Sequence, residues 1–167
     1  MRTWIIALGL LLFCFIIPLQ VFIIGNDAGF GVQGAVYRYQ ITSYGDSFMT
    51  VTRELTYVYS GLFTGRTALS VVLWAAGTMV LALTTVIPLV YWNRLPERMY
   101  RFIILGLVLA GLLCLGSCIA QYGLFFSGSA GISLPLGVLL MVIFAASLWF
   151  YRGIFIDRNA GSREDQD

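Results

Sequence analysis

The segment FIILGLVLAGLLCLGSCIAQYGLFFSGSAGISLPLGVLLMVIFAASLWFY, residues 102–151, contains no Asp, Glu, Lys or Arg. The hydrocarbon core of a bilayer is about 30 Å thick, and a helix needs roughly 20 apolar residues to cross it. These fifty residues are too many for one crossing and suit two. The glycine-rich stretch 126–131 separates the two halves and is typical of a turn. The segment therefore predicts a hairpin of two transmembrane helices.

The composition of the whole chain supports a membrane protein. Its 167 residues are 59% hydrophobic and 11% charged, whereas a soluble domain carries about 25% charged residues. The net charge of +2 gives no reason to expect nucleic acid as a partner. Histidine is absent, which excludes His-ligated haem, His-based zinc sites and nucleophile–histidine pairs. We expect no enzyme activity, cofactor or metal site.

Two further apolar runs raise the number of predicted spans to four. The spans cover about residues 3–24, 67–92, 100–125 and 132–155. The predicted fold class is an all-α integral membrane protein, a four-transmembrane-helix bundle with a small β-hairpin extracellular loop between helices 1 and 2. A single four-helix membrane domain would occupy residues 1–167. The polar tail 157–167 is predicted to be disordered.

Residues 25–66 form the one sizeable hydrophilic segment and are predicted to be a β-rich extracellular loop. Residues 35–42 and 49–59 alternate in character around the turn signal 43–47, which predicts a β-hairpin. The connector 25–34 is predicted to be irregular. A lone hairpin is marginally stable in water, so we expect it to lean on helix ends, a third strand or another subunit.

The distribution of arginine predicts the orientation in the membrane. Three arginines lie in the predicted outer loop: Arg38, Arg53 and Arg66. The other seven fall on the opposite side: Arg2, Arg94, Arg98, Arg101, Arg152, Arg158 and Arg163. The positive-inside rule then predicts a multi-pass plasma-membrane protein with both termini cytoplasmic and the loop 25–66 extracellular.

Small residues form a stripe on the third predicted span that would let another helix approach closely. The predicted packing residues are Gly106, Ala110, Gly111, Cys114, Ser117 and Cys118. Cys114 and Cys118 share a helix face, but a redox or metal role is disfavoured, because buried thiols in apolar surroundings are unreactive.

The outer loop concentrates tyrosine and arginine, which is the composition of a protein contact surface. The predicted surface comprises Tyr37, Arg38, Tyr39, Tyr44, Arg53, Tyr57 and Tyr59. Alternatively, these side chains hold the hairpin together through cross-strand pairs. The carboxylates Asp27, Asp46 and Glu54 show no ligand-loop or acid-pair spacing, so we expect them on the solvated surface.

Few polar groups lie inside the predicted spans. Gln20, Thr84, Thr85 and Gln121 would line a solute path if they converged on one water-filled cavity. Interhelical hydrogen bonds are the favoured alternative, because no charged residue lies in the interior of any predicted span.

The predicted layout of four spans, inside termini and a large first outer loop is similar to that of the claudin and tetraspan group. The claudin first loop carries a tryptophan, a Gly-Leu-Trp run and two cysteines. This loop has Gly61-Leu62-Phe63 and neither cysteine nor tryptophan. The Cys-Cys-Gly motif of tetraspanins is also missing, so the resemblance concerns architecture and not family membership.

The sequence has many residues suited to helix packing and protein contact and few groups suited to catalysis. This balance favours a non-catalytic role. The sequence predicts a structural or assembly subunit in a lipid bilayer, associating laterally and through its outer loop as a homo-oligomer or with other membrane subunits. A small channel or transporter subunit is the alternative. A membrane enzyme is the third and least favoured hypothesis.

Overall fold

The structure is a computed structural model that describes residues 3–25, 28–91, 95–128 and 130–151. These residues form five helices and six strands. In chain order they are α1 (Thr3–Phe15), β1 (Gln20–Ile24), β2 (Gly29–Gln33), β3 (Tyr37–Thr42), β4 (Gly45–Thr50), α2 (Val51–Tyr59), α3 (Gly65–Val90), α4 (Glu97–Tyr122), β5 (Ser127–Gly128), β6 (Gly131–Leu134) and α5 (Leu136–Phe150).

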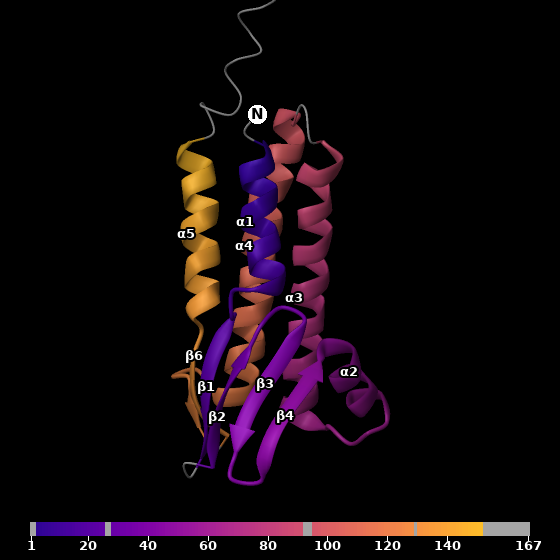
Figure 1. Ribbon diagram of the computed structural model, residues 1–167, viewed down its shortest axis with the longest axis vertical. Helices are drawn as coiled ribbons and strands as arrows, with labels where there is room; N and C mark the ends of the chain where they lie inside the picture. The colour runs from indigo at the N-terminus through magenta and orange to yellow at the C-terminus, as the bar shows by residue number, and fades with distance from the viewer. Residues whose placement is uncertain (1–2, 26–27, 92–94, 129, 152–167) are drawn as a thin grey trace, which may run out of the picture.

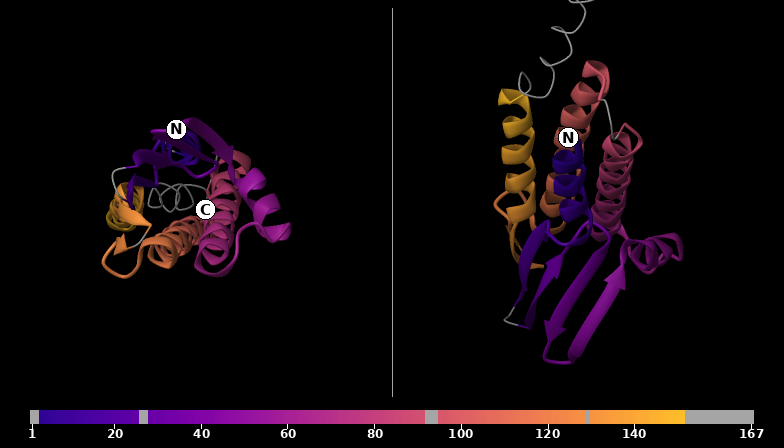
Figure 2. Two further views of the ribbon diagram at one scale, coloured as in Figure 1. Left: turned by 90° about the horizontal axis from the view of Figure 1, so that it is seen from below. Right: turned by 45° about the horizontal axis from the view of Figure 1, so that its top comes forward.

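The four longer helices run alongside one another, and the strands gather at one end of them (Figure 1). Helix α3 packs along α4, with α1 against α3 and α5 against α4. The short helix α2 projects beside β4 and the adjacent end of α3 (Figure 1). The view from below in Figure 2 shows the strands and α2 wrapping around one side of the helices.

The strands form one antiparallel sheet in the order β4-β3-β2-β1-β6-β5. Strand β1 follows α1 directly, and β6 leads directly into α5. The two strands pair with each other, Val21 opposite Leu134 and Ile24 opposite Gly131. The sheet therefore joins the first outer segment of the chain to the second.

The prediction of an all-α fold with a small hairpin is wrong, and so is the four-span, tetraspan-like layout. Helices α3 and α4, with 26 residues each, are long and apolar enough to cross a membrane. Helices α1 and α5 have 13 and 15 residues. At 1.5 Å per residue they are about 20 and 22 Å long, which is shorter than a hydrocarbon core of about 30 Å.

The first and fourth predicted spans are shorter helices because their outer ends are strands. Helix α1 ends at Phe15, three residues before Pro18, whose ring and missing N–H oppose a continuing helix. The apolar run Gln20–Ile24 then pairs with β2 on one side and β6 on the other. Short apolar runs do not distinguish a central strand from a helix end by periodicity.

The outer loop also differs from its prediction. Strands β3 and β4 form a hairpin, but residues 51–59 are helix α2 and not the second strand. The Thr50 side chain caps this helix by accepting a hydrogen bond from the Arg53 N–H at 3.4 Å. The connector 25–34 contains strand β2. Its glycines permit close strand pairing, since a Cβ at Gly31 would lie 2.6 Å from the Tyr39 carbonyl oxygen.

Glycine in α4 leaves room for a side chain of α3. A Cβ at Gly106 would lie 2.1 Å from Oγ1 of Thr84, which itself donates to the Val80 carbonyl at 2.7 Å. At Gly116, on the same helix, a Cβ would make an ordinary contact of 3.5 Å with Leu73. The two glycines are thus a matched pair for testing the packing.

We predict that Gly106→Ala lowers the stability of the protein by about 1–3 kcal/mol, because the added methyl group forces α3 and α4 apart. Gly116→Ala should be neutral or slightly stabilising, because alanine favours a helix over glycine. Thermal unfolding in mild detergent measures both. Equal unfolding midpoints for the two variants would contradict this account of the α3–α4 contact.

Candidate functional site

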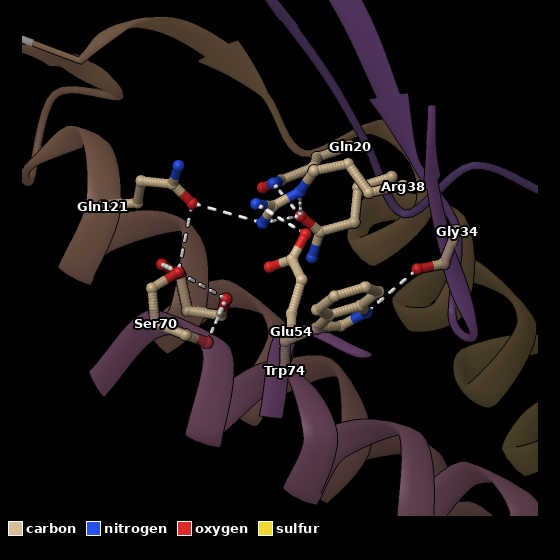
Figure 3. Close-up of polar contacts among 9 residues, drawn as sticks. Gln20, Gly34, Arg38, Glu54, Ser70, Trp74 and Gln121 are labelled. Carbon is tan, nitrogen blue, oxygen red and sulfur yellow. Dashed lines mark hydrogen bonds and ion pairs between the residues drawn. The ribbon is translucent and has the colours of Figure 1, made fainter. Parts of the chain in front are cut away.

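Polar side chains gather between the sheet and the helices and form what we call the buried polar cluster. It comprises Gln20, Gln33, Arg38, Glu54, Ser70, Ser117, Gln121 and Ser133. The sheet contributes a row of directly opposed residues, Gln20, Gln33 and Arg38. All members except the half-buried Gln121 are buried. Figure 3 shows side chains from the sheet and helices converging on one point.

Arg38 on β3 is the centre of the cluster (Figure 3). Its Nε donates to Oε1 of Gln33 at 2.9 Å, and its Nη2 donates to the same oxygen and, at 3.4 Å, to Gln121. Its Nη1 lies 3.0 Å from Oε1 of Glu54. The guanidinium also lies 5.3 Å from the centre of the Trp74 ring, which adds a cation–π attraction. One side chain thereby links β2, α2, α3 and α4.

Glu54 corrects a prediction, because it is not a solvated carboxylate. It is 1% exposed and is the buried residue of α2. Asp46 is exposed as expected, and Asp27 lies outside the described residues. Burial raises the pKa of Glu54, and the positive charge of Arg38 opposes that rise. Within the described part of the chain, Oε2 of Glu54 has no hydrogen-bond partner.

The remaining members extend the cluster in two directions. On the sheet, Nε2 of Gln20 donates to Gln33 at 2.9 Å, and Ser133 donates to Gln20 at 3.4 Å. Between the helices, Ser70 donates to the Ser117 carbonyl at 2.9 Å, and Ser117 donates to the Ser70 carbonyl at 2.8 Å. The first two bonds tie β1, β2 and β6 together within the sheet, and the last two fasten α4 to α3.

Trp74 fastens the turn between β2 and β3 to α3. Its indole N–H donates to the Gly34 carbonyl at 3.0 Å, and Thr78 one turn further donates to the Ala35 carbonyl. Trp74 is fully buried. The sheet therefore has a fixed orientation against α3.

The chemistry of the cluster is that of a structural joint. It contains one acid and one base, which face each other, and amides and hydroxyls that bond among themselves. In the part of the chain that the structure describes, no three His, Cys, Asp or Glu side chains are grouped so that they could hold a metal ion.

The opposite face of the sheet points away from the helices and is apolar. Two rows of directly opposed residues cross it, together with the opposed pair Tyr37 and Thr50. We call this the outer sheet face; its residues are Ser127, Ile132, Ile23, Phe30, Ile41, Asp46, Leu134, Val21, Val32, Tyr39, Phe48, Tyr37 and Thr50. Ile23, Phe30, Phe48, Ile132 and Leu134 are each about half exposed or more. An exposed apolar surface that spans several strands marks an interaction site.

The predicted packing stripe lies inside the chain. Gly106 and Cys114 face α3 at Thr84 and Gly77, and Gly111 faces α5 at Val138. Ser117 bonds to Ser70 of α3, and the Cys118 thiol donates to Ser133 at 3.3 Å. Ala110 is fully buried. These six residues therefore hold this chain's own helices and sheet together.

The predicted contact residues of the loop separate into three groups. Arg38 is 8% exposed and belongs to the buried polar cluster. Tyr37 and Tyr39 lie on the outer sheet face, where Tyr37 stacks on Phe48 and Tyr39 donates to Asp46 at 3.0 Å. Tyr44 and Tyr59 are 97% and 96% exposed, at the β3–β4 turn and the end of α2. Arg53 donates to Tyr57 on the exposed side of α2.

The four residues of the alternative solute path do not converge. Gln20 and Gln121 belong to the buried polar cluster. Thr84 and Thr85, about four turns along α3, donate to the carbonyls of Val80 and Leu81 in their own helix. A pocket of about 310 Å³ between α4 and α5 is lined by none of the four; its residues are Ile104, Val108, Val142, Ala145, Ala146, Trp149 and Phe150.

Sequence reasoning missed Gln33, Ser70, Trp74 and Ser133, and misjudged Glu54. Gln33 and Arg38 do alternate with apolar neighbours, which places them on one strand face. The pattern does not say which face is buried. Polar residues usually face solvent, and here the larger apolar face is the outer one.

Comparisons with known proteins add no relative. No protein-family model matches the chain, and no curated protein is similar to it in sequence.

We predict that Arg38→Met destabilises the protein by about 3–5 kcal/mol, because it leaves the carboxylate of Glu54 buried without its partner. Arg53→Met is the matched control. Arg53 is exposed, and within the described residues its guanidinium donates to Tyr57 on its own helix, so the loss of this side chain should cost less than about 1 kcal/mol. Chemical unfolding in mild detergent gives both values.

The double variant Arg38→Met/Glu54→Leu shows whether Arg38 stabilises the protein through its ion pair with Glu54 or only through packing. Removing the stranded carboxylate should recover part of the stability that Arg38→Met loses. If the double variant loses the sum of the two single losses, the two side chains are not coupled, and Arg38 does not act through Glu54.

The raised pKa of Glu54 predicts a pH dependence of stability. The native state binds this proton more tightly than the unfolded chain, whose carboxyl titrates near its ordinary value of 4.5. The resulting stabilisation is complete below that value and is lost as the pH rises through the folded pKa. Glu54→Gln should therefore lose less stability than the native protein between about pH 4.5 and pH 7.

Thermal unfolding at the two pH values tests this expectation. If Glu54→Gln shows the same difference between the two pH values as the native protein, Glu54 does not titrate differently in the folded state.

Proposed function

We propose that the chain is a non-catalytic membrane protein that acts as a structural or assembly subunit, associating with other subunits laterally and through its outer loop. The outer sheet face carries this proposal. A sheet that turns its polar row toward the protein interior and its apolar rows outward lacks a cover on the apolar side. A protein partner supplies such a cover.

The features of the buried polar cluster support an assembly role over a catalytic one. Its side chains bond to one another and hold a sheet, and none of them lines the pocket between α4 and α5. The channel alternative loses support, because Gln20 and Gln121 lie apart from Thr84 and Thr85.

We further propose that the protein lies in the plasma membrane, with α3 and α4 in the bilayer, the sheet outside the cell, and the beginning of α4 on the cytoplasmic side. Arg98 and Arg101 support this orientation. They lie in the first turns of α4, at the end of that helix away from the sheet, where the positive-inside rule expects them (Figure 1).

Purification of the full chain from native membranes in mild detergent tests the assembly role. We expect native mass spectrometry to show a complex larger than one chain, containing further copies or another subunit. A clean monomer that retains no partner would contradict the proposal.

A further inference from the structure

The outer sheet face has the dimensions and composition of an interface between two sheets. We propose that it binds a second copy of this chain, with the two sheets packed face to face about a two-fold axis. This inference rests on the proposed assembly function and names its partner and its surface.

Lipid is a poor cover for this face. Strand β4 is an edge strand, so half of its backbone N–H and C=O groups have no strand partner. Open sheet edges do not occur against hydrocarbon, because their polar groups would lose water without gaining a partner. The exposed Asp46 carboxylate, held by Tyr39, lies beside the same edge. If a protein covers this face instead, the backbone groups of the β4 edge and the Asp46 carboxylate remain accessible to water at the rim of the interface.

The exposed area of this face lies between the lower limit and the usual size of a specific protein interface. Phe30 and Phe48 are 54% and 60% exposed, and Ile132, Leu134 and Ile23 are close to half exposed. Together with the partly exposed valines and tyrosines they present on the order of 600 Å². Specific interfaces bury about 800 Å² per partner, and about 500 Å² per partner is the lower limit.

The charge of this face favours a copy of itself. Asp46 is its one ionisable carboxylate, and it lies in the end strand β4 and not at the centre of the sheet. Two copies packed centre to centre therefore bring no like charges together. Aromatic residues are enriched and charged residues depleted, as in the core of protein interfaces. Two sheets with such faces pack about 10 Å apart with their strands roughly 30° from alignment.

The association of purified full-length protein in mild detergent, measured by light scattering over a range of concentrations, tests the inference. We expect the native chain to dimerise and Phe30→Asp to raise the dimer dissociation constant at least tenfold. Leu62→Asp is the matched control. Leu62 is an apolar residue that is 71% exposed, in the link between α2 and α3, and its replacement should leave the constant unchanged.

A second position keeps the test decisive. Circular dichroism checks that each variant is folded, and if Phe30→Asp is not, Phe48→Asp on β4 takes its place. A dimer that persists unchanged in the folded variant overturns the inference, although assembly by another surface would stand. A native chain that is monomeric alone yet bound to a different subunit also overturns it while the proposed function stands. A monomer without any partner removes both.

Quenching distinguishes the lipid alternative. The variants Phe30→Trp and Leu62→Trp are each placed in vesicles whose lipids carry brominated acyl chains. We expect the fluorescence of the tryptophan at position 30 to be quenched no more than that of the tryptophan at position 62. Strong quenching specific to position 30 would place the outer sheet face in lipid and overturn the inference.

Discussion

The ion pair between Arg38 and Glu54 sets the requirement on which the sheet end of the molecule depends. A buried guanidinium is tolerated only where hydrogen-bond acceptors surround it. Here they come from Gln33 of β2, Glu54 of α2 and Gln121 of α4. No two neighbouring elements supply them all. The sheet, α2 and the ends of α3 and α4 must therefore be in place together, and the pair couples them.

This requirement also decides which way the sheet faces. Side chains alternate along a strand, so a polar row that points inward places the intervening residues outward. The row of Gln20, Gln33 and Arg38 meets the helices, and the apolar rows that contain Phe30 and Phe48 face away from them. The inner face therefore carries the polar row beside the buried apolar side chain of Phe22, while the outer face is mostly apolar and exposed. The proposed function and the proposed dimer both rest on that exposed apolar face.

The close packing of α3 against α4 depends on a different set of residues. Glycine at positions 77 and 106 lets α3 and α4 meet closely, and the reciprocal bonds of Ser70 and Ser117 close the gap near the sheet. Small residues and paired hydroxyls are the means by which helices associate where lipid competes for apolar surface. The stripe that the sequence suggests for contact with another helix is thus satisfied within the chain.

The sequence by itself determined what local composition can determine. The long apolar segments near residues 67–92 and 100–125 mark two helices able to cross a membrane, and the small-residue stripe marks a close helix contact. Tertiary structure alone decided that Gln20–Ile24 and Gly131–Leu134 are strands, because their pairing joins residues more than a hundred positions apart. It also decided that Glu54 is buried, whereas the local sequence pattern predicts that this residue is exposed to solvent. Only the folded chain brings Arg38 to it, and only that charge makes its burial tolerable.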